Sequence, residues 1–184
     1  MDLDLLLALA TGVGLAAACG LRAFLPLLAV GLAAHFGLLH LRPELAWLAR
    51  PPALWALGTA SVLELAADKV PVLDHALDAL GTALRPAAAW VGSYAILQGW
   101  GAPWAQLFAL AMGAGALAVH GAKAQTRVGS SALTLGAGNP VLSAVEDALA
   151  FLLVVVAVLL PLLALLLVAL LVAGLVRRSR HRAA

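Results

Sequence analysis

The segment that decides the fold is ELAADKVPVLDHALDALGTALRP, which runs from Glu64 to Pro86. It carries four carboxylates, one lysine, one histidine and one arginine in a chain that is otherwise strongly apolar. A second polar segment, HGAKAQTRVGSSALTLGAGNPVLSAVED, runs from His120 to Asp147. Hydrocarbon solvates charge poorly, so ionisable groups among membrane segments are rare and usually functional. The two segments therefore mark a candidate functional site.

The composition of the whole chain indicates an integral membrane protein. Its 184 residues are 64% apolar and only 11% charged, and the mean hydropathy is +1.05. An average soluble domain carries about 25% charged residues, so no soluble fold would hide this much apolar surface. The length predicts one domain. We therefore predict an all-α, polytopic membrane helix bundle over residues 1–176.

The net charge of +2 has a local origin. Four arginines lie in the last eight residues, at Arg177, Arg178, Arg180 and Arg182. Lys and Arg concentrate on the inner side of membrane proteins, so we predict that residues 177–184 form a basic cytoplasmic tail. Nucleic-acid binding is not expected from so local a patch. The single cysteine, Cys19, excludes an intramolecular disulfide.

Proline divides the apolar blocks, which predicts about five to seven spans with broken or kinked helices. Pro26 predicts a kink or break near Arg22, because proline lacks the backbone donor that a helix needs. Two separate helices and one bent helix are both consistent with this proline. Pro71 predicts the start of a polar helix over residues 72–84, followed by a separate apolar piece over residues 87–98.

The segment 128–139 is rich in glycine, serine and threonine, and we predict that it is not helical. Asn139-Pro140 then predicts a helix start with Asn139 as its cap, and such a terminus attracts anions. The same spacing of PVL and DAL occurs from Pro71 and from Pro140. An internal duplication is one interpretation of this echo, although it arises easily by chance in a chain rich in alanine and leucine.

A spacing of four residues places Glu64 with Asp68, and Asp74 with Asp78, on shared helix faces. Two such pairs of like charge need cations between them. Protein cations, protons and a metal ion are the alternatives. Carboxylate oxygens suit magnesium or calcium, so Asp74 and Asp78 are candidate ligands of a divalent cation. No complete metal or cofactor motif accompanies them, and no other cofactor is expected.

The second polar segment supplies positive charge. His120, Lys123 and Arg127 are spaced to line one side of a helix. If that side meets Glu64 and Asp68, a buried ion-pair network results. Other pairings are open, and the full set of candidate site residues is Arg22, Glu64, Asp68, Lys69, Asp74, Asp78, Arg85, His120, Lys123, Arg127, Asn139, Glu146 and Asp147.

Arg22 is the most isolated of these charges. It lies between apolar runs with no acidic neighbour in sequence, so its partner must come from another helix. Glu146 and Asp147 are the acids that we expect to pair with Arg22 or with Lys123. A lone intramembrane arginine either closes such a salt bridge or binds an anion.

Three motifs resemble a known family. GLRAFLPLLAVGL at residues 20–32, DKVPVLDHALDALGTALRP at residues 68–86, and KAQTRVGSS with GNPVLSAVED at residues 123–131 and 138–147 occur in matching order. Together they resemble the small bacterial membrane proteins grouped as domain of unknown function 4126. The resemblance covers nearly the whole chain. It supports the choice of segments and implies no activity or mechanism.

The leading hypothesis is a channel or carrier for an ion or small polar solute, working in the lipid bilayer as a homo-oligomer. Arg22, Lys123 and Arg127 would hold an anion or balance the acids, and the carboxylates would bind a cation or relay protons. One alternative is a structural or assembly protein whose charges only lock helices together. The other is a metal-dependent membrane enzyme acting on phospholipids or pyrophospholipids, which the absence of a complete motif disfavours.

Overall fold

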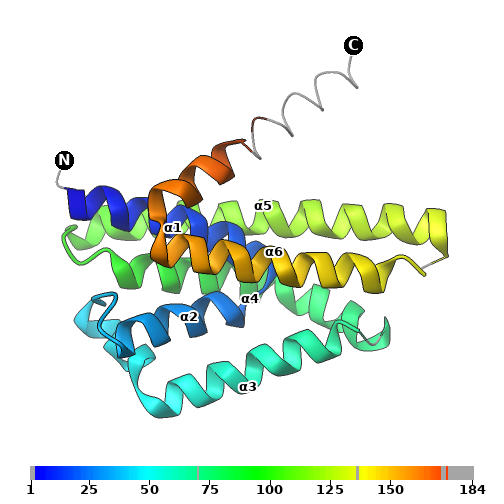
Figure 1. Cartoon of the computed structure of the whole chain (residues 1–184), viewed down its shortest axis with the longest axis horizontal. Helices are drawn as coiled ribbons and strands as arrows, with labels where there is room; N and C mark the ends of the chain where they lie inside the picture. The colour runs from blue at the N-terminus through cyan, green and yellow to red at the C-terminus, as the bar shows by residue number, and fades with distance from the viewer. Residues whose placement is uncertain (1–2, 70, 136, 171–172, 174–184) are drawn as a thin grey trace.

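The computed structural model describes residues 3–69, 71–135, 137–170 and 173, and of residues 71–77 it describes only the backbone. The described residues form an elongated bundle of helices without any strand (Figure 1). The helices are α1 (Leu3–Leu21), α2 (Phe24–His35), α3 (Pro51–Ala67), α4 (Pro71–Ile96), α5 (Ala102–Thr134) and α6 (Asn139–Leu159), with a short 3-10 helix η1 (Pro43–Ala49). A further helical segment, Pro161–Leu170, follows α6.

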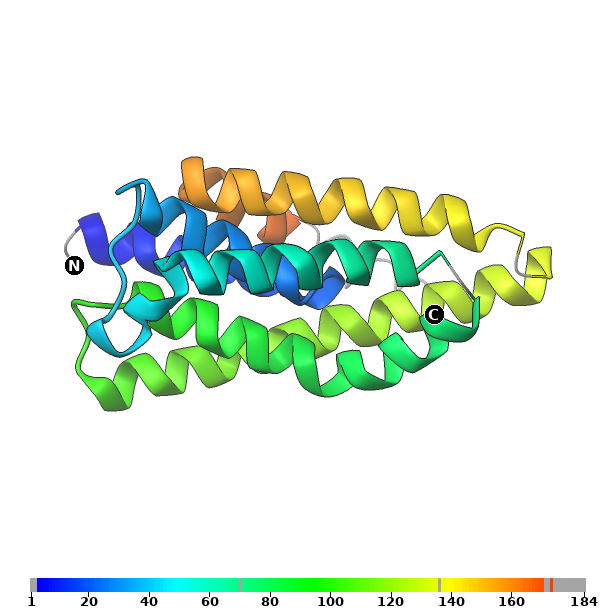
Figure 2. The ribbon, with the colours of Figure 1, turned by 90° about the horizontal axis from the view of Figure 1, so that it is seen from below.

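The helices run back and forth between the two ends of the bundle (Figure 2). One end holds the start of α1, η1 and the α4–α5 connection, and the other holds the α3–α4 turn and the α5–α6 connection (Figure 1). This topology brings the two polar segments of the sequence to the same half of the molecule.

Helix α1 is the central element, and it packs against α4, α5 and α6. Almost every residue from Ala10 to Gly20 is buried. Glycines allow this close packing: a methyl group at Gly14 would lie 2.7 Å from Ala157 Cβ. Small residues let helix backbones approach closely where no hydrophobic effect drives them together. The tight packing fixes the end of α1, and therefore the position of Arg22.

The predicted break near Arg22 separates two helices, with Arg22 and Ala23 between them. Pro26 is the third residue of α2, where its missing backbone donor costs no intrahelical hydrogen bond. Pro26 is thus well placed at the start of α2, whereas in a continuous helix it would remove the hydrogen bond to the Arg22 carbonyl. The sequence left open two separate helices or one bent helix, and the structure has two separate helices.

Two predictions of helix boundaries were wrong. Helix α4 is continuous from Pro71 to Ile96 and contains Pro86, where separate segments were expected. Close packing accompanies this proline, since a methyl group at Gly113 of α5 would lie 3.0 Å from the Pro86 carbonyl oxygen. Helix α5 continues to Thr134, whose hydroxyl donates to the Ser130 carbonyl at 2.8 Å. Such bonds make the Ser- and Thr-rich segment compatible with a helix.

At the end of the bundle away from the polar segments, Arg42 has a structural role. Its Nη1 donates to the carbonyls of Leu97 at 2.7 Å and Trp100 at 3.0 Å. The guanidinium also lies over the Tyr94 ring, 4.5 Å from the ring centroid. Arg42 therefore ties the segment before η1 to the end of α4.

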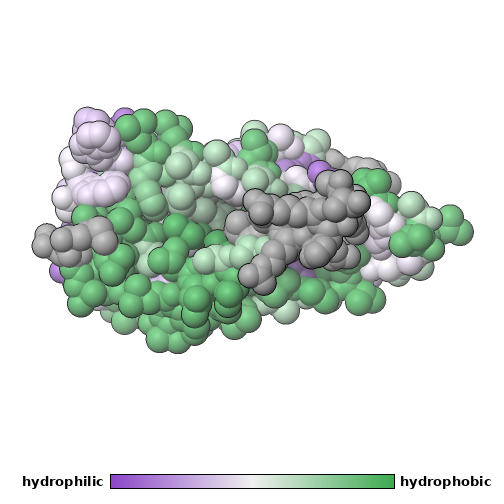
Figure 3. Space-filling model, turned by 90° about the horizontal axis from the view of Figure 1, so that it is seen from above, coloured by the Kyte–Doolittle hydropathy of each residue, from purple (hydrophilic) through white to green (hydrophobic). Residues whose placement is uncertain are grey.

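Three described helices, α1, α5 and α6, are long and apolar enough to cross a membrane, and α2 and Pro161–Leu170 are shorter apolar helices. Hydrophobic side chains cover most of the face in Figure 3. This pattern is that of a helical membrane protein. The total of about five to seven spans stays a prediction, and so does the basic tail, because residues 177–184 lie outside the described chain.

Replacing Gly20 with alanine should lower thermal stability. The added methyl would lie 2.5 Å from Val119 Cβ and 2.7 Å from the Ala116 carbonyl oxygen. Overpacking costs about 1–3 kcal/mol, more than the about 0.5–1 kcal/mol that alanine gains over glycine in a helix. The measurement is the midpoint of thermal unfolding in detergent. Gly115→Ala is the matched control, since nothing lies within 4 Å of its added methyl; equal midpoints would contradict the α1–α5 packing.

Candidate functional site

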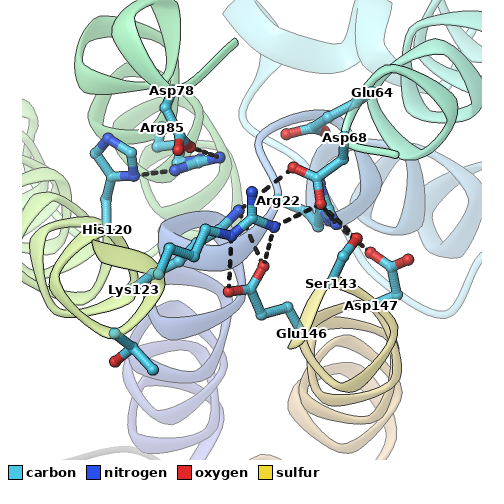
Figure 4. Close-up of polar contacts among 12 residues, drawn as sticks. Arg22, Glu64, Asp68, Asp78, Arg85, His120, Lys123, Ser143, Glu146 and Asp147 are labelled. Carbon is cyan, nitrogen blue, oxygen red and sulfur yellow. Dashed lines mark hydrogen bonds and ion pairs between the residues drawn. The ribbon is translucent and has the colours of Figure 1, made fainter. Parts of the chain in front are cut away.

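A buried cluster of charged side chains lies where the α1–α2 junction, the α3–α4 turn, α5 and α6 meet (Figure 4). Asp68, directly after α3, is at its centre. Its Oδ2 atom accepts hydrogen bonds from Arg22 Nη2 at 2.6 Å and Arg127 Nη2 at 2.7 Å. Ser143 Oγ donates to the same oxygen at 2.6 Å, and Lys123 Nζ lies 3.9 Å from Oδ1. One carboxylate therefore connects four separate parts of the chain.

Asp68 lies outside the helices, and these contacts determine the protonation state of its carboxyl group. Burial acts to raise the pKa of a carboxyl group. The hydrogen bonds from Arg22, Arg127 and Ser143, together with the Lys123 ammonium, outweigh burial and hold the pKa of Asp68 well below its usual range. Asp68 is therefore ionised at neutral pH and acts as a fixed negative charge among the cations.

Glu146 on α6 is the second acid of the cluster. Its Oε2 atom accepts a hydrogen bond from Arg127 Nη2 at 2.6 Å, and Oε1 accepts from Arg127 Nε at 3.2 Å. Lys123 Nζ lies 3.2 Å from Glu146 Oε2, but at angles that do not form a hydrogen bond. The two cations of α5 thus lie between the acid after α3 and the acid of α6.

Asp147 extends the cluster toward its edge. Its carboxylate pairs with Arg22 through Oδ1 and with Lys69 Nζ at 3.1 Å through Oδ2. Lys69 also donates to Ser143 Oγ at 3.3 Å, and its side chain is 52% exposed. Lys69 is therefore the accessible member of the cluster, whereas the side chains of Arg22 and Lys123 are each 1% exposed.

Glu64 has a different role from the one predicted. Its Oε1 accepts the backbone N–H of Ala23 at 2.9 Å and its Oε2 that of Phe24 at 3.2 Å. The buried carboxylate therefore caps the N-terminus of α2 and compensates for the break after Arg22. Of the two acids that the sequence analysis considered as partners of the α5 cations, Asp68 forms ion pairs with Lys123 and Arg127.

A smaller polar group lies beside the cluster, between α4 and α5. Arg85 is 2% exposed; its Nη2 lies 3.5 Å from Asp78 Oδ1, and its Nη1 contacts His120 Nδ1. Thr82 Oγ1 is 3.4 Å from His120 Nε2. Because an arginine nitrogen can only donate, His120 Nδ1 is the acceptor side of this contact.

The structure brings most of the predicted site residues into these two groups: Arg22, Asp68, Lys69, Lys123, Arg127, Glu146 and Asp147 in the cluster, with Asp78, Arg85 and His120 beside it. Asn139 lies apart; it begins α6 as predicted, but its side chain donates to Ser131 Oγ at 2.9 Å instead of capping the helix. The side chain of Asp74 lies outside the described residues. The sequence analysis missed Ser143, whose one signal is its position one turn before Glu146 and Asp147.

The divalent-cation site at Asp74 and Asp78 stays a prediction. Among the described residues, no group of three or more His, Cys, Asp or Glu side chains is arranged to hold a metal ion. Asp78, the described member of the pair, faces the Arg85 guanidinium. A metal at Asp78 would compete with that cation for the same carboxylate.

The fold and the cluster together define a class: an all-helical protein with apolar helices of membrane-spanning length and a buried ion-pair network. The chain belongs to the family described as domain of unknown function (DUF4126), whose model matches residues 9–181. This match confirms the resemblance seen in the three motifs. No curated protein and no solved structure matches the chain.

Substituting Asp68 with asparagine should destabilise the protein strongly. The change leaves Arg22, Arg127 and Lys123 buried with less negative charge, and breaking a buried pair in this way costs about 3–5 kcal/mol. The measurement is thermal unfolding in detergent. Glu44→Gln is the control, because Glu44 is 61% exposed and lies 3.8 Å from its partner Arg42. An Asp68→Asn midpoint equal to that of the control would contradict the central role of Asp68.

Substituting Glu64 with alanine should also lower the unfolding midpoint, because the buried N–H groups of Ala23 and Phe24 lose their acceptor. We expect a loss of about 1–3 kcal/mol for Glu64→Ala. Glu64→Gln keeps one carbonyl acceptor of the same length and should lose less. If the two variants unfold at the same temperature, Glu64 is not the cap of α2.

Proposed function

We propose that the protein is a carrier for an ion or small polar solute in the bacterial inner membrane, with the Asp68-centred cluster as its binding site. The observation that carries the proposal is the position of the α1–α2 break within the cluster. Arg22 stands at that break and contributes directly to the buried charges. Membrane carriers commonly build their sites from interrupted helices, whose backbone groups and charges face the solute.

The energetics favour a functional role for so many buried charges. Buried ion pairs add little net stability, since desolvation offsets their attraction. Helix association in membranes usually relies on small residues, and on serine, threonine or asparagine as polar partners. The tight packing of α1 already supplies helix contacts through small residues. A purely structural role therefore leaves the five described charges at Arg22, Asp68, Lys123, Arg127 and Glu146 with little to add.

Shared partners also support a site that changes conformation. Arg22 pairs with both Asp68 and Asp147, which belong to different parts of the chain. Lys123 lies between Asp68 and Glu146, at 3.9 Å and 3.2 Å. A cation with two acids available can shift toward either one while keeping a counter-charge. Transitions between packed states require such alternative arrangements.

The closed state of the cluster supports a carrier over an open channel. Asp68, Lys123 and Arg127 are each 7% exposed or less. A cavity of about 830 Å³ opens at the other end of α1, where Asp4, Thr11 and Gln98 are among its lining residues. Between this cavity and the cluster, α1 is packed closely against its neighbours. A solute would need a conformational change to pass from one to the other.

A structural ion-pair lock is the second candidate function, and one observation favours it. Each described acid of the cluster lies within 4 Å of a cation, so Asp68, Glu146 and Asp147 need no ligand for charge compensation. The lock and the carrier make opposite predictions for flux, and the same variant distinguishes them.

The distinguishing variant is Lys123→Met combined with Glu146→Leu, which removes one cation and one acid and retains packing volume. The variant leaves the net charge of the cluster unchanged, and Arg127, which loses Glu146, keeps its hydrogen bond to Asp68, so the variant should fold. Reconstituted into liposomes, it should lose flux of the solute that wild-type protein moves in a panel of sodium, potassium, chloride and phosphate ions. Loss of at least tenfold is expected.

The matched control is Glu44→Gln combined with Arg50→Met, which removes one acid and one cation from exposed positions at the opposite end. This variant should keep wild-type flux. If wild-type protein moves none of the solutes above empty liposomes, or if the Lys123→Met/Glu146→Leu variant moves them equally well, the lock is the better account.

A further inference from the structure

Four nitrogen atoms of buried cations, in the cluster and in the smaller group beside it, have no hydrogen-bond acceptor within the part of the chain that is described: Arg22 Nε and Nη1, Arg85 Nε, and Lys123 Nζ. The three side chains are 1–2% exposed. A buried donor without an acceptor loses its hydration without compensation, and the loss is greater for charged donors. These atoms are the most costly unsatisfied groups of the described site.

The three cations also act against one another. The positive charges of Arg85 and Arg22 both repel Lys123, and Arg22 repels Arg85. Their side chains converge from three elements, namely the α1–α2 junction, α4 and α5 (Figure 4). An anion between the three side chains would reduce their mutual repulsion and would accept hydrogen bonds from the unused donors.

The neighbouring acids form ion pairs with these cations, with Lys123 Nζ 3.2 Å from Glu146 Oε2, but they accept no hydrogen bond from the four nitrogen atoms. Asp68 Oδ2 and Glu146 Oε2 accept hydrogen bonds from Arg127, and Asp68 meets Arg22 through Nη2. Asp78 approaches Arg85 at Nη2, at 3.5 Å. The acids thus contact Arg22 and Arg85 through their Nη2 atoms, and the Nε atoms of both side chains have no acceptor.

We propose that Arg22, Arg85 and Lys123 bind a small oxyanion of the phosphate class, either free inorganic phosphate or the phosphate of a lipid headgroup. Donors that come from three directions match an anion with several acceptor oxygens. Guanidinium groups are well suited to phosphate oxygens, and an ammonium group adds a compact charge. The inference rests on the proposed function only in naming the anion as the solute; binding itself does not require transport.

The test is equilibrium dialysis of the full-length, detergent-purified protein against radiolabelled inorganic phosphate, with thermal unfolding in parallel. Wild-type protein should bind phosphate saturably at one site per chain, and phosphate should raise the unfolding midpoint by mass action. Chloride at equal ionic strength should do neither. Phosphatidic acid in the micelles forms the second arm, and a rise in midpoint with this lipid alone would identify the headgroup as the source.

Arg85→Met and Lys123→Met should each weaken phosphate or phosphatidic acid binding at least tenfold, whereas Arg50→Met, an exposed arginine at the opposite end, should bind like wild type. Lys123→Met removes a cation that its neighbours repel, so it remains a valid test if Arg85→Met does not fold. The proposal is overturned if wild-type protein binds neither ligand, or if the folded variants bind as wild type does.

These outcomes separate the site from the carrier. Phosphate binding that depends on Arg85 and Lys123, without flux in liposomes, supports the oxyanion site and contradicts transport. Flux of a different solute without phosphate binding overturns the oxyanion site and leaves the carrier standing.

Discussion

The arrangement of the bundle depends on one buried carboxylate, that of Asp68. It accepts hydrogen bonds from the α1–α2 junction, from α5 and from α6, while it belongs to the turn between α3 and α4. A charge removed from water must find its compensation within the protein, so these elements cannot separate without exposing or isolating the charges. The close glycine contacts of α1 with α5 and α6 hold the end of α1, which precedes Arg22, against these helices, and the Glu64 cap allows the chain to reverse direction there.

The charged residues of this protein fall into two kinds. Arg42, at the opposite end, donates through Nη1 to two backbone carbonyls and lies over a tyrosine ring, although its Nε also lacks an acceptor within the described chain. Arg22 and Lys123 also keep donors without acceptors, but they lie among other cations and share their acids with Arg127. What distinguishes this group from Arg42 is therefore the number of buried cations that lie together, and not the presence of an unsatisfied donor. The donors of Arg22, Arg85 and Lys123 that lack acceptors are the reason to propose an anion as the solute of the carrier.

The sequence predicts the polar residues of the site better than it predicts the helices that position them. Helical spacing was enough to group His120, Lys123 and Arg127, and the lack of a local partner for Arg22 correctly required an acid from another helix. The continuity of α4 through Pro86 and of α5 to Thr134 was missed, because contacts between helices override local propensity there. The capping role of Glu64 could not be predicted, since its partners are backbone groups of a distant segment. Asp74 and the arginine tail remain predictions from the sequence.

The central claim is that a solute reaches the cluster from water, and this can be tested by cysteine labelling. Cys19, the single cysteine, is buried and can be replaced with alanine. Ser143→Cys then places one thiol beside Asp68, at a position that is 1% exposed. In proteoliposomes, a membrane-impermeant thiol reagent should modify this cysteine slowly from at least one side, because a carrier must open its site to water. Complete protection from both sides, in folded protein, would contradict the carrier and leave a sealed structural lock.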